Sequence, residues 1–120
     1  MTALQILASL SEQQLSDATR LKRVVANFQR ELGATFGNAM VKRRQRRWEI
    51  DLAVYEKPLT GTKTYRMPAR QIQDWVRQAA NRAHPRLYKR LKMEVGAWEM
   101  GKRTQKLFAP VKIFIDASQD

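Results

Sequence analysis

The residues of this sequence best suited to chemistry are its cations, and the chemistry that they favour is the binding of phosphate. The run from Lys42 to Arg47 places five Lys and Arg in six positions. A second concentration lies between residues 70 and 106, where ten basic residues stand against three acidic ones. Arginine dominates the run, and its planar guanidinium can bind two phosphate oxygens at once. We therefore predict phosphate contact at both places.

The candidate phosphate-binding residues are the cations of the run, of the following helical segments and of a later stretch: Lys42, Arg43, Arg44, Arg46, Arg47, Arg70, Arg77, Arg82, Arg86, Lys89, Arg90, Lys92, Lys102 and Arg103. Arg70 and Arg77 are seven positions apart and share one face of a helix, as do Arg86, Lys89 and Arg90. The alternative for each of them is an ordinary solvated helix face. The run itself is predicted to be an arm that becomes ordered on binding, with a solvated loop or a localisation signal as alternatives.

Net charge supports a polyanionic partner. The 120 residues include 23 Lys and Arg against 11 Asp and Glu, which gives a net charge of +12 and a pI near 10.8. Such an excess destabilises a compact chain by self-repulsion unless a polyanion neutralises it. The sequence therefore predicts a non-enzymatic nucleic-acid-binding protein, and it leaves open DNA or RNA and single or double strands. A charge that serves solubility alone is the competing interpretation.

Catalysis has little support in the sequence. Glu49 and Asp51 stand two apart on one face of a predicted strand, which permits a remote alternative, a Mg²⁺-dependent nuclease. Such a nuclease needs a third acidic metal ligand and a lysine at a fixed spacing after this strand, and the sequence has no pair with that spacing there. We therefore expect these carboxylates to neutralise nearby arginines. His84 is the single histidine and cysteine is absent, so we expect no metal site, and we place His84 in a capping or exposed position. No nucleotide-binding or serine-hydrolase motif is present, and we expect no cofactor and no enzymatic activity.

Aromatic side chains provide a second kind of contact with nucleic acid, because bases stack on them. Tyr55, Tyr65 and Trp48 lie on or near a predicted hairpin. Trp48 falls on its apolar face and is expected in the core, and Trp75 and Trp98 belong to the apolar stripes of predicted helices.

The first element expected to position these residues is a helix from Ser11. Ser11 and Gln14 have the spacing of a capping box, and weak helical turns through Leu4, Leu7 and Leu10 precede it. Gly33 is expected to end this helix. Its apolar positions recur at steps of three and four: Ala18, Leu21, Val25, Phe28 and Leu32. This stripe is expected to pack in the core, with a helix pair in a homo-oligomer as the alternative.

Strand and helix patterns alternate after Gly33. Period-two spacing over 48–55, turn residues over 58–62 and a Thr- and Tyr-rich segment over 62–67 predict a β-hairpin. Pro68 opens a second helix that Pro85 interrupts. The segment 86–100 fits either a helix or a strand, and its Lys, Arg, Leu, Met and Glu content favours the helix. The alternation over 111–115 predicts a last strand.

These elements predict an α+β fold: an N-terminal helix or helical hairpin, a central antiparallel β-hairpin, one or two basic helices and a C-terminal strand that joins a small sheet. We expect one domain over 1–120, and we expect it in the cytoplasm because no signal peptide or membrane span is evident. The structural rival to nucleic-acid binding is an assembly component, such as a virion, head-tail or ribonucleoprotein subunit, that oligomerises and presents a basic face.

Overall fold

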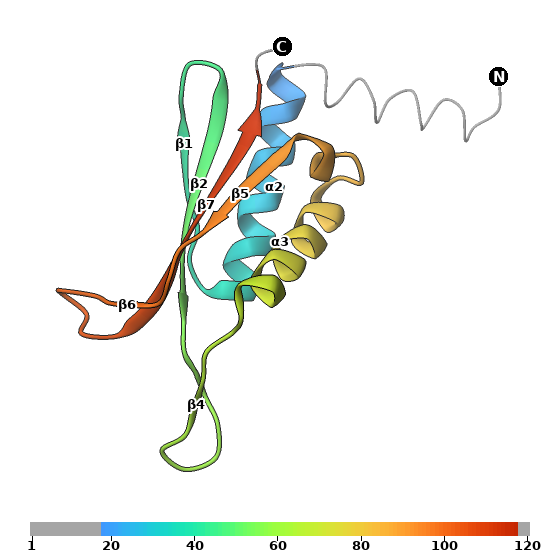
Figure 1. Ribbon diagram of the computed structural model, residues 1–120. Coiled ribbons are helices and arrows are strands. Elements are labelled where there is room, and N and C mark those ends of the chain that lie inside the picture. The colour runs from blue at the N-terminus through green and yellow to red at the C-terminus, as the bar shows by residue number, and fades with distance from the viewer. Residues whose placement is uncertain (1–17, 118–120) are drawn as a thin grey trace.

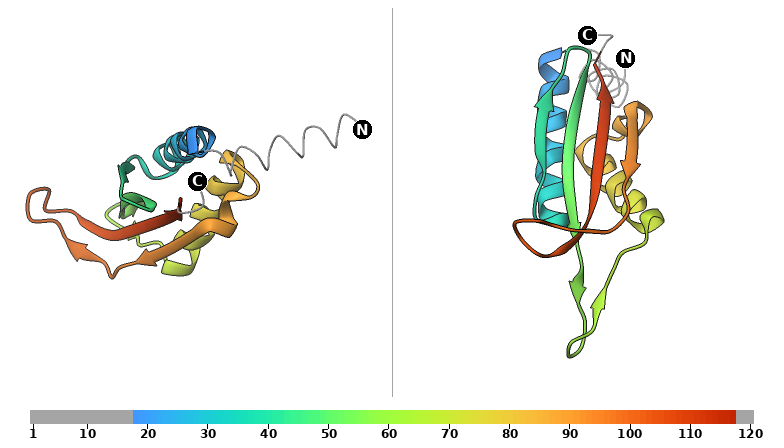
Figure 2. Two further views of the ribbon diagram at one scale, coloured as in Figure 1. Left: turned by 90° about the horizontal axis from the view of Figure 1, so that it is seen from above. Right: turned by 60° about the vertical axis from the view of Figure 1, so that its left-hand side comes forward.

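The computed structural model describes residues 18–117. Helices α2 (Ala18–Phe36) and α3 (Ala69–Ala83) lie on one face of an antiparallel sheet (Figures 1 and 2). The strands and the one 3-10 helix of this part of the chain are β1 (Met40–Arg43), β2 (Arg47–Tyr55), β3 (Lys57–Pro58), β4 (Thr64–Tyr65), η1 (Leu87–Arg90), β5 (Leu91–Val95), β6 (Glu99–Met100) and β7 (Leu107–Asp116). The expected α+β class is confirmed.

The main sheet has the strand order β1-β2-β7-β5, and β6 pairs with the first residues of β7. Every neighbouring pair is antiparallel. Ile113 of β7 lies opposite Ile50 of β2 on one side and Met93 of β5 on the other. Successive side chains of a strand point to opposite faces, so Ile50, Leu52 and Val54 are buried beneath the helices while their neighbours face away from them. We call the surface without helices the open face.

The apolar stripe of α2 packs in the protein's own core. Leu21, Val25, Phe28 and Leu32 are at most 1% exposed and belong to the core cluster, whereas Ala18 is exposed. The core interpretation is therefore confirmed. A homo-oligomer through this face is not supported, because these four side chains are already covered by the rest of the chain.

Helix α2 runs past Gly33, so the predicted end at that glycine is wrong. The last turn is stabilised by Phe36, whose ring lies 6.2 Å from that of Trp75. Gly37 ends the helix instead: its φ is +84°, and its N–H donates to the carbonyl oxygen of Gly33. A left-handed glycine just after a helix is a common way to end it. The proposed start at Ser11 and the turns through Leu4, Leu7 and Leu10 lie outside the described residues.

The predicted hairpin is only partly right. Residues 47–55 do form a strand, but β2 pairs with β1 and β7 along its length. The turn chemistry over 58–62 closes a separate two-stranded ribbon, β3 with β4, that projects from the end of β2 (Figure 1). The C-terminal strand is confirmed as β7, which is longer than predicted and lies inside the sheet between β2 and β5.

The prediction of a third helix over the segment 86–100 is wrong, and the strand alternative is right. After α3 the chain makes the short 3-10 helix η1 and then β5. Leu91, Met93 and Val95 lie opposite Ile115, Ile113 and Val111 of β7.

Burial against a strand some 20 residues away thus outweighs the helical preference of Lys, Met and Glu.

Within the described residues, no helix has the length and apolar character needed to cross a membrane.

Candidate nucleic-acid interface

The basic run forms the end of the β1–β2 hairpin, so the prediction of an arm that becomes ordered on binding is wrong. Lys42 and Arg43 belong to β1 and Arg47 begins β2. The N–H of Arg44 donates to the carbonyl oxygen of Arg47 across the turn. The guanidinium of Arg43 donates to the carbonyl oxygens of Arg44 and Arg47 and stands 5.3 Å from the ring centre of Trp48. Arg43 therefore helps to hold the turn.

Two carboxylates of β2 bind most of the remaining cations of the run. Lys42 Nζ lies 3.6 Å from Asp51, Arg44 lies 3.5 Å from Glu49, and Arg47 lies 2.8 Å from Glu49. Burial would raise the pKa of Glu49, but the hydrogen bonds and charges of Arg47 and Arg44 outweigh it and lower that pKa below its ordinary value. The expectation that these carboxylates neutralise nearby arginines is confirmed for Glu49, whereas Asp51 pairs with a lysine, Lys42. The run keeps less free charge than its sequence suggests.

A second group of cations lies on the outer side of the two helices. We call the exposed cations of α2 and α3 the helical surface: Lys22, Arg23, Arg30, Arg70, Arg77 and Arg82. The helices are antiparallel, because Phe36 packs on Trp75 while Arg82 Nε lies 2.8 Å from Glu31. Arg30 and Arg82 line a groove of about 430 Å³ between the helices.

Very few carboxylates oppose the helical surface. Glu31 is the one acidic residue of α2 and Asp74 the one of α3. Each is engaged by an arginine, Glu31 by Arg82 and Asp74 by Arg77 at 3.7 Å. Lys22, Arg23 and Arg70 have no ion pair with any described residue. The helical surface thus carries a concentrated excess of positive charge.

The sequence prediction named the α3 half of this surface and missed the α2 half. Lys22, Arg23 and Arg30 follow the polar side of the predicted helix, opposite the apolar stripe, and this spacing was the available signal. Net charge does not reveal them, because the first 40 residues are nearly neutral, a balance that includes Glu12 and Asp17, both outside the described residues.

The other predicted cations are spread over the molecule. Arg86 and Lys89 lie at the 3-10 turn after α3, and the side chain of Arg90 turns to the carbonyl oxygen of Asp116 at the end of β7. The expected common helix face of Arg86, Lys89 and Arg90 is therefore wrong. Lys102 and Arg103 lie in the β6–β7 loop, which projects from the sheet on the side away from α3 (Figure 1).

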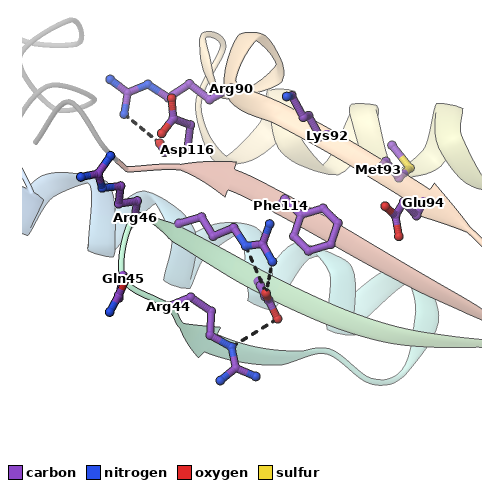
Figure 3. Close-up of a pocket in the computed structure, with 11 residues that line it drawn as sticks. Arg44, Gln45, Arg46, Arg90, Lys92, Met93, Glu94, Phe114 and Asp116 are labelled. Atoms are coloured by element: carbon purple, nitrogen blue, oxygen red, sulfur yellow. Dashed lines mark hydrogen bonds and ion pairs between the residues drawn. The ribbon is translucent and has the colours of Figure 1, made fainter.

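A hollow of about 1130 Å³ opens where the β1–β2 turn, the start of β5 and the end of β7 meet (Figure 3). We call it the sheet-end hollow; its lining residues are Arg44, Gln45, Arg46, Arg47, Glu49, Arg90, Lys92, Met93, Glu94, Phe114 and Asp116. Five predicted phosphate-binding cations meet in this hollow. They are Arg44, Arg46 and Arg47 of the β1–β2 turn, Arg90 of η1 and Lys92 of β5. Phe114 lies at its centre, and the guanidinium carbon of Arg47 is 4.5 Å from the centre of the Phe114 ring.

The aromatic residues predicted to stack on bases are mostly engaged within the fold. Trp48 packs against the core beneath Arg43, and the Tyr55 ring lies 6.2 Å from that of Phe108. The hydroxyl of Tyr65 donates to the side-chain oxygen of Gln71 at 2.6 Å. Trp75 on α3 and Trp98 both pack against the core, but Trp98 lies between β5 and β6 and not on the predicted helix.

His84 is buried at the C-cap of α3, so the capping position is right and an exposed one is wrong. Its Nδ1 accepts a hydrogen bond from the N–H of Arg86. The described residues contain no group of three or more His, Asp and Glu side chains close enough to hold a metal ion.

Comparison with known proteins gives no relative from which a function could be carried over. No protein-family model matches the chain, and neither a curated protein nor a solved structure matches it.

Proposed function

We propose that the protein is a non-enzymatic nucleic-acid-binding protein whose helical surface contacts the phosphate backbone. One observation carries the proposal: six exposed cations cover the outer side of α2 and α3, while these helices contain only two carboxylates, Glu31 and Asp74. Polyanion binding is the physical use for such a field, because phosphates replace the missing counter-charges.

The residue types and the concave shape of the helical surface also support a phosphate backbone as the ligand. Five of the six cations are arginines, whose forked donors suit phosphate oxygens. The groove between the helices adds a concave line in which Arg30 and Arg82 stand on the two walls. A backbone that follows this groove would meet cations from both helices.

A salt titration tests the proposal. We expect the affinity for a short DNA or RNA duplex to fall steeply with salt, because binding releases counterions from the phosphates. The triple substitution Arg23→Gln, Arg30→Gln and Arg70→Gln removes three cations of the helical surface. If each contacts one phosphate, the slope of log affinity against log salt loses about 0.9 per cation, about 2 to 3 in all.

The matched control removes the same charge elsewhere. Lys63, Lys106 and Lys112 are exposed and lie in the β3–β4 turn, the β6–β7 loop and strand β7. Their triple substitution by Gln should change the slope by less than about 1. Equal effects of the two variants would mean that net charge, not the helical surface, sets the affinity. Absence of binding at low salt would end the proposal altogether.

A further inference from the structure

The sheet-end hollow holds one arginine in a fixed place. One side of the Arg47 guanidinium stands over the Phe114 ring, at 4.5 Å from the ring centre. Its edge is bound by Glu49, whose Oε1 accepts from Nε at 3.1 Å and from Nη2 at 2.8 Å. About half of the side chain, 52%, remains exposed. The side of the guanidinium away from Phe114 is thus a held, planar and accessible surface.

A surface of this kind suits an unpaired nucleic-acid base. Bases that are splayed out of a helix stack on aromatic rings and on the planes of arginine guanidinium groups. A base within a duplex has both faces covered by its neighbours and cannot use such a platform. Here the Phe114 ring and the carboxylate of Glu49 hold the guanidinium before any ligand arrives, so little ordering is needed on binding.

The rest of the hollow suits a whole nucleotide better than a bare phosphate. Arg46 and Lys92 are exposed, form no ion pair with a described residue, and lie on different walls, the β1–β2 turn and β5 (Figure 3). They can receive the phosphate on either side of a bound base. Glu94 is also part of the lining and can accept a hydrogen bond from an N–H group of the base, whereas it would repel a dense row of phosphates.

We propose that the sheet-end hollow binds one nucleotide of a single strand, with its base stacked on Arg47 and its phosphates on Arg46 and Lys92. This inference rests on the proposed function for the class of ligand. It adds a second surface, since the hollow lies on the open face and the helical surface on the opposite side of the sheet.

The test uses substitutions that keep the charge. The probe is a fluorescein-labelled oligothymidylate of about eight nucleotides, within the range that small single-strand sites cover, beside a duplex of the same length. Arg47→Lys keeps the positive charge but loses the plane, and Phe114→Leu removes the ring that supports it. We expect each to weaken oligothymidylate binding about tenfold, the loss of one stacked base, and to leave duplex binding unchanged.

Arg66→Lys is the matched control, because it makes the same change at an exposed arginine that lies outside the hollow. We expect it to stay within about twofold of the wild-type protein. Thermal unfolding followed by circular dichroism verifies that each variant folds, and Phe114→Leu, which changes neither partner of the Arg47–Glu49 ion pair, serves if Arg47→Lys does not.

The outcomes separate this inference from the proposed function. Oligothymidylate affinity that is unchanged in Arg47→Lys and Phe114→Leu, or lost equally in Arg66→Lys, overturns the stacking site while leaving the helical surface untouched. A wild-type protein that binds the duplex but not the oligothymidylate also overturns it. Conversely, a tenfold loss in the hollow variants with no effect of the helical-surface triple variant supports the stacking site and contradicts the proposed function.

Discussion

Replacing Phe28 with Ala tests whether the apolar face of α2 belongs to the core, on which the position of the helical surface depends. Phe28 has no exposed surface and lies among Leu21, Val25 and Leu32. Truncation of a fully buried Phe costs about 3–5 kcal/mol, from lost burial and the cavity left behind. A domain of this size is stable by about 5–15 kcal/mol, so the variant should stay folded but lose much of its reserve. At about 4 °C per kcal/mol, its melting temperature should fall by about 12–20 °C.

The assay is reversible urea and thermal unfolding, followed by circular dichroism at two protein concentrations. Arg23→Ala is the control on the same helix, since its side chain is exposed and its loss should change stability by about 0.5 kcal/mol or less. If Phe28→Ala cost less than about 1 kcal/mol, the burial argument would be refuted. A midpoint that rises with protein concentration would show instead that the apolar face is shared between chains.

Three further predictions concern local interactions. A double-mutant cycle with Glu31→Gln and Arg82→Gln should give a coupling of about 0.2–1 kcal/mol, since both side chains are partly exposed; more than about 2 kcal/mol would contradict this. The lowered pKa of Glu49 means that its carboxylate adds stability at neutral pH, which is lost as the pH falls through the folded-state pKa. Urea midpoints of the wild type and Glu49→Gln should therefore converge only below the folded-state pKa, which lies under the ordinary glutamate value, and a gap that persists at still lower pH would contradict the ion pairs. Gly96→Ala places a Cβ 2.7 Å from the proline ring in β7 and should cost about 1–3 kcal/mol, whereas Gly33→Ala, with open space in α2, should stabilise by about 0.5–1 kcal/mol in thermal unfolding.

The helices could be predicted from sequence because their signal is local. In α3, Ile72, Val76, Ala79 and Ala80 repeat at helical spacing and all are buried. In α2 the same kind of stripe is visible, and the predicted end at Gly33 falls short of Phe36. The extra turn depends on the contact between Phe36 and a residue of α3, which no local window contains.

The sheet was harder to predict because its pairing is not local. The spacing of apolar residues in β5 fits a helix or a strand and its composition favours the helix, but pairing with β7 makes it a strand. The sequence gives no strand signal for β1, because Lys42 and Arg43 belong to a run of cations that resembles a solvated loop. Pairing of Val41 with Ile50 gives that segment its conformation, through backbone hydrogen bonds that side-chain types do not reveal.

In the candidate site too, contacts between residues close in sequence could be predicted, whereas contacts between distant residues could not. Glu49 and Asp51 lie close to the run in sequence, and their neutralising role was anticipated. The helical surface joins cations from two helices whose ion-pairing residues, Glu31 and Arg82, are 51 positions apart. Phe114 of β7 reaches Arg47 of β2 across a strand pair in the same way. Neither juxtaposition can be read from spacing.

The two cationic surfaces differ in what the fold itself explains. On the open face, the charges are those that an uncovered sheet needs: Lys42 meets Asp51, and Arg47 meets Glu49 while covering the Phe114 ring. Pairing and solvation account for most of that charge without a ligand. On the helical surface, solvation would be served equally by acidic residues, and a mixture of signs would avoid repulsion. The excess of one sign there has no explanation in the stability of the fold, so it is the stronger reason to look for a polyanionic partner at α2 and α3. In the sheet-end hollow, the reason to expect a ligand is the fixed plane of the Arg47 guanidinium and not its charge. Substitutions that keep the charge therefore test the hollow without changing the helical surface.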